Sequence, residues 1–388
     1  MGRRRRAATA VAVLLGGLLT ACTSSHPLDG QPPWAHLPWR AGSLPVPDGT
    51  RALVRDATWC GGRWAVVGAT ADARGATRPA VWSSPDGRSF RAGRLDPGSD
   101  YYAARAILTS VGCSRGRLAA VGAKSGGAHG LPRTATWRER PDGVLAAVRA
   151  PFPLFGGSTN VAVSRLAGGP AGYLVTGTRT SGAAVWTSPS GTSFRLHEGT
   201  PGLASTPSIR TQALDAVADA HGWVVAGTGT DDSGRLVATV WSGRGDRWRR
   251  QALPGGRTIS TAERATRVGA GPVVAGLLDD SFGLWLRQGG RWSLDGSFGE
   301  RDAGATSAAY VSGLAWTGGL VVATYSDGRQ FRLAIGGSSP GEADLPTAVT
   351  VRGDHTVTVA THGEDALLLT DDGQRGRVWS ARVPGPTS

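Results

Sequence analysis

Three cysteines are the residues of this chain whose side chains could undergo covalent chemistry. Cys22 ends an uncharged segment close to the N-terminus, whereas Cys60 and Cys113 lie further along, each next to a glycine. A thiol can be acylated, can ligate a metal, or can pair with a second thiol in an oxidising compartment. The segments that carry the cysteines decide among these three outcomes.

The segment before Cys22 has the parts of an export signal. Arg3 to Arg6 form a positive run, and residues 7–21 carry no charge, which is the outline of a signal peptide. The uncharged stretch is shorter than the roughly 20 apolar residues that a resident membrane helix needs. Its end, Leu19-Thr20-Ala21-Cys22, resembles the lipobox of bacterial lipoproteins, in which small residues precede the lipidated cysteine. We therefore expect cleavage before Cys22, a lipid on its thiol, and a protein held on the extracytoplasmic face of the cell membrane, exported by the Sec or the twin-arginine route.

The residues after Cys22 predict a tether. Six prolines and two tryptophans lie between residues 23 and 47, and Pro-rich segments without periodicity resist compact folding. The predicted organisation is a signal peptide at 1–21, the lipidated cysteine and tether at 22–50, and one folded domain at 51–388.

The charge balance limits the partners. The chain has 42 Lys+Arg against 29 Asp+Glu, a formal net charge of +13. A basic exported protein can lie against anionic phospholipid or another acidic polymer. The arginines are scattered, without the basic stripe and stacking aromatics of nucleic-acid-binding proteins, so we expect no nucleic-acid partner. The expected partners are membrane lipid, through Cys22, and a protein or glycan of the cell envelope.

A short apolar strand that ends in a small residue recurs seven times, at intervals of about 37 to 55 residues, which is the range of propeller blades. These strands end at Gly68, Gly122, Gly177, Gly227, Gly276, Thr324 and Thr361.

Each of these strands is followed by another that usually ends in tryptophan, as at Trp82 and Trp186; Phe331 to Leu333 and Leu367 to Leu369 take that place in the last two repeats. A further short apolar segment precedes each small-ended strand, so every repeat supplies about four strands and no helix. We therefore predict an all-β fold, a seven-bladed β-propeller of four-stranded blades, with the tryptophans buried between blades.

The turn after the tryptophan strand carries a family resemblance. The segments from Ser84 to Phe90 (Ser-Pro-Asp-Gly-Arg-Ser-Phe) and from Ser188 to Phe194 resemble a degenerate Asp box, the bacterial neuraminidase repeat of sialidase-type propellers. That family has one residue between its aspartate and glycine, whereas Asp86 and Gly87 are adjacent. Together with the lipobox, the chain resembles an actinobacterial-type lipoprotein with a sialidase-like propeller. Asp boxes stabilise turns and carry no catalysis.

A sialidase site needs three arginines that hold a carboxylate, a tyrosine paired with a glutamate, and a further acid. The family's Arg-Ile-Pro signature is absent, and no motif pairs a glutamate with any of the five tyrosines, at 101, 102, 173, 310 and 325. We therefore assign no catalytic residue. Two hypotheses remain: a non-catalytic scaffold that binds a ligand or partner, which we favour, and a divergent sialidase-like, glycan-active hydrolase. Three arginines at the channel mouth beside a tyrosine-glutamate pair would favour the hydrolase.

The sequence predicts no metal and no cofactor. The seven histidines never occur at zinc-site spacing. The segments 231–234 and 279–280 hold paired aspartates that could bind calcium, but they fit hairpin turns better. No phosphate loop or dinucleotide fingerprint occurs in the context that it needs.

Cys60 and Cys113 occupy matching places in neighbouring repeats. Cys60 lies eight positions before Gly68, and Cys113 lies nine before Gly122, so both fall at the turn between the first and second strands of their blades. The exported compartment is oxidising, and we predict a disulfide between them; two separate buried thiols are the alternative.

Overall fold

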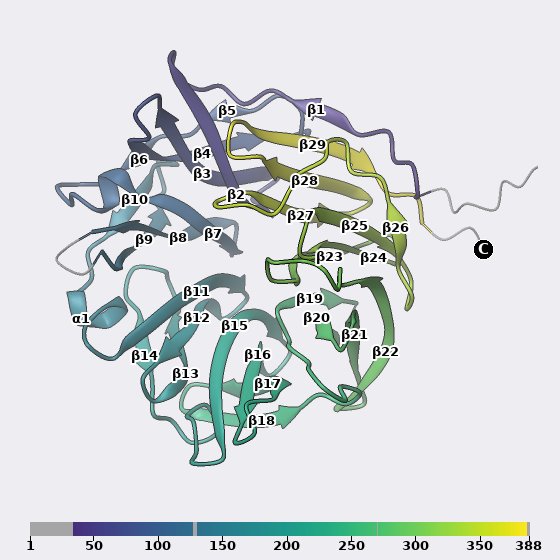
Figure 1. Ribbon diagram of the computed structural model, residues 1–388. Helices are drawn as coiled ribbons and strands as arrows, with labels where there is room; N and C mark the ends of the chain where they lie inside the picture. The colour runs from purple at the N-terminus through teal and green to yellow at the C-terminus, as the bar shows by residue number, and fades with distance from the viewer. Residues whose placement is uncertain (1–33, 127–129, 270, 386–388) are drawn as a thin grey trace, which may run out of the picture. The chain divides into compact units, whose positions relative to one another are not determined.

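A computed structural model describes residues 34–126, 130–269 and 271–385. These residues form seven sheets arranged around a central axis (Figure 1), antiparallel except for one short parallel pairing in blade 2. The predicted all-β, seven-bladed propeller is confirmed. The predicted signal peptide and Cys22 lie outside the described residues, in which no helix is long and apolar enough to span a membrane.

The two inner strands of each blade form a hairpin. The innermost strands are β2 (Thr50–Cys60), β7 (Ile107–Ser114), β11 (Asn160–Gly169), β15 (Ile209–Asp219), β19 (Arg264–Val268), β23 (Tyr310–Thr317) and β27 (Thr356–His362). Their partners are β3 (Arg63–Asp72), β8 (Arg117–Ser125), β12 (Gly172–Arg179), β16 (Gly222–Asp231), β20 (Gly271–Leu278), β24 (Leu320–Ser326) and β28 (Asp365–Asp371).

The outer half of each blade is more varied in length. The third strands are β4 (Thr77–Ser84), β9 (Pro132–Glu139), β13 (Gly182–Ser188), β17 (Leu236–Arg244), β21 (Ser281–Gln288), β25 (Phe331–Gly336) and β29 (Gly376–Arg382). The outermost strands are β5 (Arg91–Ala92), β10 (Leu145–Val148), β14 (Arg195–His197), β18 (Arg247–Ala252), β22 (Arg291–Glu300), β26 (Gly341–Ala343) and β1 (Arg40–Gly42). Blade 2 adds β6 (Leu95–Asp96), parallel to β10. The described residues also include two short helices, η1 (Ala103–Arg105) and α1 (Phe152–Phe155).

The ring closes through a strand from the N-terminal side. β1 pairs antiparallel with β29, so that blade 7 combines three C-terminal strands with one strand that precedes blade 1. The Trp39 indole donates to the carbonyl of Asp344 at 3.1 Å, and Trp34 packs against the core of blades 6 and 7. The described part of the predicted tether, from Trp34, thus contributes to the propeller.

The last repeat differs from the sequence prediction. Val357 to Thr361 lie in the innermost strand β27, and Leu367 to Leu369 lie in the second strand β28. Both segments therefore lie one strand closer to the axis than the sequence predicts. Thr370, next to the end of β28, takes the place of the small residue of the second strand. Two consecutive buried strands, each apolar and each followed by threonine, cannot be distinguished by composition alone, which explains the error.

The core lies between neighbouring blades. Trp82, Trp137, Trp186, Trp241 and Trp285 are each at most 1% exposed. Four of these indoles also donate to a backbone carbonyl, those of Pro45, Leu154, Gly202 and Pro254. Each tryptophan therefore buries a large apolar surface and satisfies its one donor, except Trp137, whose indole nitrogen has no partner in the described residues.

A disulfide joins the first two blades. Cys60 at the end of β2 and Cys113 in β7 are bonded, with their Cα atoms 5.5 Å apart. The predicted pairing of these two cysteines is present in the structure.

Candidate functional site

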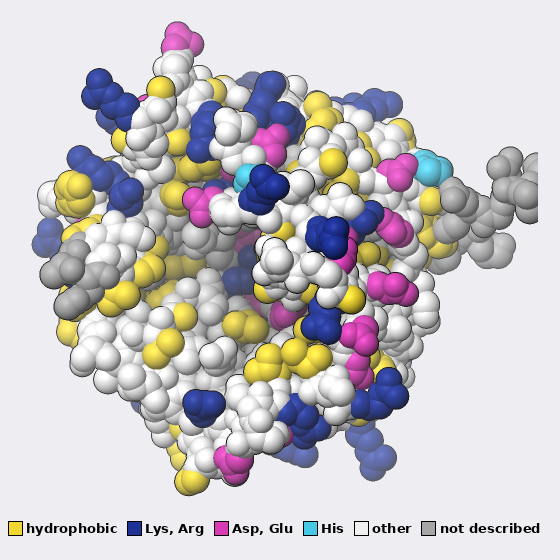
Figure 2. Space-filling view, in the orientation of Figure 1, with side chains coloured by type: hydrophobic (Ala, Val, Ile, Leu, Met, Phe, Trp, Pro, Cys, Tyr) yellow, Lys and Arg dark blue, Asp and Glu magenta, His cyan; other side chains and the backbone are white. Residues whose placement is uncertain are grey.

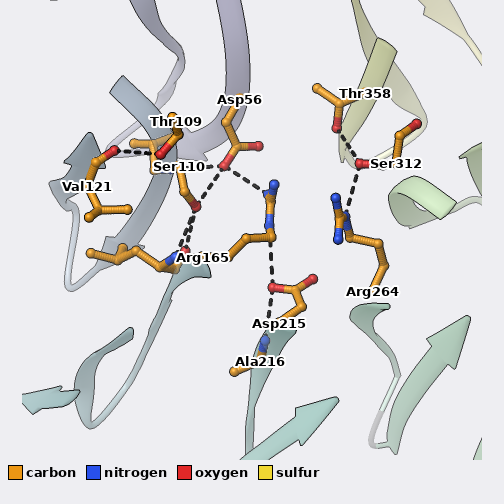
Figure 3. Close-up of polar contacts among 12 residues, drawn as sticks. Asp56, Thr109, Ser110, Val121, Arg165, Asp215, Ala216, Arg264, Ser312 and Thr358 are labelled. Atoms are coloured by element: carbon orange, nitrogen blue, oxygen red, sulfur yellow. Dashed lines mark hydrogen bonds and ion pairs between the residues drawn. The ribbon is translucent and has the colours of Figure 1, made fainter. Parts of the chain in front are cut away.

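Every innermost strand contributes a polar residue from the same repeat position, twelve residues before the small residue of the second strand. Asp56 precedes Gly68 by this interval, and Thr358 precedes Thr370 by it. Their side chains point toward the axis of the propeller (Figure 3). We call this set the axial ring: Asp56, Ser110, Arg165, Asp215, Arg264, Ser312 and Thr358.

A β-bulge places several of these residues. The pairing register shifts between Val54 and Asp56 in β2, between Leu108 and Ser110 in β7, and between Ala213 and Asp215 in β15. A bulge bends its strand and leaves one residue outside the ladder. The side chain after the bulge is thereby directed into the channel.

The same bulges explain why the second strands of blades 1 to 5 carry a glycine opposite the bulge, two to four residues before the strand ends. A Cβ at Gly68 would lie 1.8 Å from the carbonyl oxygen of Leu53, and a Cβ at Gly227 would lie 2.0 Å from that of Gln212. The backbone of the bulged strand occupies the space that a side chain would need. The recurring small residue and the axial ring are therefore two results of one local geometry.

The acidic side chains of the channel bind the backbone of the next blade. Asp56 Oδ2 accepts the Val111 N–H at 2.9 Å, and Asp215 Oδ2 accepts the Ala265 N–H at 3.1 Å. Ser110 Oγ accepts the Leu166 N–H at 3.0 Å in the same manner. A buried N–H without a partner is costly, so these bonds hold consecutive blades together.

Arg165 lies between two of these carboxylates. Its Nη2 is 2.9 Å from Asp56 Oδ2, and its Nε is 3.5 Å from Asp215 Oδ1. The Asp56 side chain is only 6% exposed. Burial acts to lower the pKa of the Arg165 guanidinium, but the charges of Asp56 and Asp215 outweigh burial and raise this pKa above its usual value. Arg165 is therefore a fixed and neutralised cation.

Arg264 differs from Arg165 in having no carboxylate partner. Its Nε donates to the Ser312 carbonyl at 3.0 Å, and its Nη1 donates to the Glu263 carbonyl at 2.7 Å. In the described residues it makes no ion pair. Burial, and next the charge of nearby Arg165, lower the pKa of the Arg264 guanidinium. The guanidinium donors that remain could hold the carboxylate or phosphate group of a ligand.

Glu263 and Tyr310 stand beside Arg264. Glu263 accepts the Thr261 hydroxyl at 2.8 Å and the Val311 N–H at 2.5 Å, and burial raises the pKa of its carboxyl. Burial also raises the pKa of the Tyr310 phenol, on which the charges of Arg264 and Glu263 act as well. The Glu263 oxygens are thus held by Thr261 and Val311.

A third arginine, Arg55, lies next to Asp56 on β2, and its Nη1 is 2.6 Å from Asp371 Oδ2. Arg55 and Arg165 are therefore paired with aspartates, unlike Arg264. Figure 2 shows a hollow at the middle of the ring, in which acidic and basic side chains are visible.

The aspartate pairs named from the sequence lie in turns. Asp231 accepts the N–H groups of Ser233 and Arg235, each at 3.0 Å. Asp279 accepts the N–H and the hydroxyl of Thr258, both at 2.8 Å. No group of three or more His, Cys, Asp or Glu side chains that could hold a metal occurs in the part of the chain that the structure describes.

The comparisons with known proteins concern the fold. No family model matches the sequence, and no curated protein matches it. The structure is similar to one described as YCF48 bound to D1 peptide, with 12% identity and a TM-score of 0.53, covering 90% of this chain and 97% of that one. It is also similar to the β-propeller domain of the Trilobed protease from Pyrococcus furiosus, with 10% identity and a TM-score of 0.48, covering 85% and 95%. At these identities the likeness to YCF48 supports the propeller fold alone.

Proposed function

We propose that this protein is a lipid-anchored, extracytoplasmic β-propeller that binds a partner of the cell envelope and does not transform it. The anchoring part rests on the signal-like segment and the Leu-Thr-Ala-Cys motif that ends at Cys22. The binding part rests on the axial channel.

The observation that carries the binding proposal is the guanidinium of Arg264. It is partly buried and held by the backbone carbonyls of Ser312 and Glu263, without a carboxylate of its own in the described residues. A fixed cation of this kind favours a ligand with a carboxylate or phosphate group, because such groups form charge-assisted, bidentate bonds with arginine. The ligand is therefore expected to present an acidic group to the channel.

The carboxylates of the channel support a binding role over a hydrolytic one. A general acid or base must have an oxygen free to exchange a proton with the substrate. Both oxygens of Asp215 instead accept backbone N–H groups. Those of Glu263 accept the Thr261 hydroxyl and the Val311 N–H. These bonds maintain the ring.

A propeller of the same fold, YCF48, is described as bound to a peptide. We propose a protein segment with a carboxylate as the partner class for this chain.

The experiment is affinity capture from the membranes of the source cell, with the lipidated full-length protein in detergent as bait. Arg264→Gln removes the free cation, and Arg291→Gln removes an exposed arginine of β22 as the matched control. A charge-assisted hydrogen bond contributes about 1.5 to 3 kcal/mol, which corresponds to about ten- to a hundredfold in affinity. A partner held by wild type and by Arg291→Gln, and lost with Arg264→Gln, supports the proposal. A partner that all three baits retain equally contradicts it.

A divergent sialidase-like hydrolase is the second candidate, because the charges of Arg264 and Glu263 act on the Tyr310 phenol. Hydrolysis of a fluorogenic sialoside decides between the two. Turnover by wild type that is abolished in both Tyr310→Phe and Glu263→Gln would replace the binding proposal with the enzymatic one.

A further inference from the structure

Exposed hydrophobic side chains gather at blades 2 and 3. Of the five large hydrophobic side chains that are exposed in the described residues, four belong to these blades: Tyr101 (60% exposed), Leu131 (59%), Phe152 (56%) and Val161 (58%). They lie in the β6–β7, β8–β9 and β10–β11 connections and at the start of β11. The left edge of Figure 2, near β10 and α1 of Figure 1, shows hydrophobic side chains beside basic ones. Exposed hydrophobic side chains that cluster in this way mark interaction surfaces.

Two arginines lie over the aromatic rings of this surface. The Arg105 guanidinium carbon is 4.0 Å from the centre of the Tyr101 ring. That of Arg133 is 4.3 Å from the centre of the Phe152 ring and 5.8 Å from that of Tyr102, so the β6–β7 connection and α1 form one surface. Neither arginine forms an ion pair within the described residues. We call these five residues the aromatic patch.

The aromatic patch lies on the same face of the propeller as the start of the described chain. Phe152 follows β10, the outermost strand of blade 2 that pairs with β9, and Asp344 follows β26, the outermost strand of blade 6. These two strands occupy the same place in their antiparallel blades and run in the same direction, so both end on one face. The Asp344 N–H donates to the Ala35 carbonyl at 2.9 Å. The N-terminal segment therefore joins the propeller on the face that carries the patch.

The chain length before this segment limits the distance to the predicted anchor. Cys22 precedes Trp34 by twelve positions, and twelve residues span at most about 40 Å. A lipid on Cys22 would hold Trp34, and the face on which the chain joins the propeller, within about this distance of a bilayer.

We propose that the aromatic patch docks the propeller on the surface of an anionic bilayer, an inference that rests on the proposed lipid anchor. Tyr and Phe side chains at the level of the headgroups bury apolar surface, and tyrosine keeps its hydroxyl in contact with water. Arg105 and Arg133 add attraction to anionic phospholipid. Asp100, in the same connection as Tyr101, accepts the N–H groups of Tyr102 and Ala103, which leaves two guanidiniums against one carboxylate. The opposite mouth of the axial channel then faces away from the membrane.

An environment-sensitive fluorescent NBD label tests the docking in the lipidated full-length protein, reconstituted in vesicles. The label is attached at Ser99→Cys, two positions from Tyr101, and the control label at Ser293→Cys, since both serines are exposed. In vesicles of phosphatidylcholine and phosphatidylglycerol, the emission at position 99 should shift to shorter wavelength and be quenched by spin-labelled lipid, and that at position 293 should not. The shift should shrink in pure phosphatidylcholine and in high salt, where the attraction to arginine is lost.

Variants in the Ser99→Cys protein identify the residues that dock. Phe152→Ser should lower the docking equilibrium constant about tenfold, the effect of withdrawing one large apolar side chain from the interface. Arg105→Gln should lower it about fivefold, and Arg291→Gln, which removes an exposed arginine of β22, should leave it unchanged. Because Phe152 is 56% exposed, Phe152→Ser should keep the unfolding temperature of wild type.

Equal responses at positions 99 and 293 would overturn the proposal, as would a response at position 99 that Phe152→Ser and Arg105→Gln leave unchanged. A response in native membranes that is absent from lipid vesicles would also overturn it, and would assign the patch to a protein partner. Failure of the lipid anchor is detected separately. Cys60 and Cys113 are bonded, so a wild-type chain that takes up the thiol label at Cys22 has no lipid there.

Discussion

Replacing Arg165 by methionine should destabilise the propeller strongly, because it leaves Asp56 and Asp215 near the axis without their shared cation. The side chains of the two aspartates are 6% and 10% exposed. Breaking a buried ion pair by removal of one partner costs about 3 to 5 kcal/mol. Asp56 keeps its hydrogen bonds to Ser110 and Val111. We therefore expect the free energy of unfolding to fall by an amount near the lower limit of that range, about 3 kcal/mol.

The chain offers a matched control for this substitution. Arg195 lies 2.9 Å from Asp246, the same distance as Arg165 from Asp56, but the two side chains are 72% and 60% exposed. Exposed pairs contribute about 0.2 to 1 kcal/mol, so Arg195→Met should lose less than about 1 kcal/mol. Burial is then the main difference between the two experiments.

The assay is urea denaturation followed by tryptophan fluorescence, with the free energy of unfolding extrapolated to water. At pH 7 the two variants should differ by about 2 kcal/mol or more. At low pH the loss in Arg165→Met should shrink, since protonated carboxyls no longer need a cation. Equal losses in Arg165→Met and Arg195→Met at pH 7 would refute the assignment of Arg165 as the neutralising centre of the ring.

Three further predictions concern single contacts. The Cys60→Ala/Cys113→Ala double variant should have a free energy of unfolding about 2 to 4 kcal/mol lower than wild type, because the disulfide closes a loop with a sequence separation of 53. Reduced wild type should unfold at the same denaturant concentration as the double variant. An unchanged free energy of unfolding would contradict the chain-entropy account. Gly68→Ala should lower the free energy of unfolding by several kcal/mol or fail to fold, since its Cβ would meet the Leu53 carbonyl. Gly341→Ala, whose Cβ would enter open space, should change this free energy by less than about 1 kcal/mol. Equal effects of the two substitutions would contradict the close approach of Gly68 to the Leu53 carbonyl. The hydrogen bond from Ser84, followed by those from the Arg88 and Ser89 amides, lowers the pKa of Asp86 to about 2, so its contribution is present above about pH 4 and is lost as the pH falls toward 2. Asp86→Asn should therefore be less stable than wild type by under about 1 kcal/mol at pH 7, and thermal melts of the two proteins should converge by pH 2.

The propeller and its disulfide could be predicted from the sequence because both depend on local, repeated patterns. A short Val/Ala strand before a small residue marks the second strand of most blades, and the cysteines fall at matching turns of neighbouring repeats. The seventh blade was harder. Its outermost strand, Arg40–Gly42, is three residues long and lies in a Pro-rich segment, and its pairing with β29 is a long-range contact that no local pattern encodes.

The axial ring was missed for a different reason. Its members share a repeat position and are all polar, but they are of four different types, aspartate, serine, arginine and threonine, so no single residue motif marks them. The β-bulges that direct these side chains inward leave no periodicity in the sequence. A signal was nonetheless present: a polar residue stands twelve positions before the small residue in every repeat, once Thr370 replaces Thr361 in the last one.

Fatty-acid labelling of the protein in its own cell tests the central claim, attachment to the membrane through Cys22, most directly. Wild type should incorporate radioactive palmitate and sediment with membranes. Cys22→Ser should lose the label and either accumulate unprocessed or appear in the medium, while Cys60→Ser should keep both the label and the membrane location. Wild-type protein recovered without label in the soluble fraction would contradict the account.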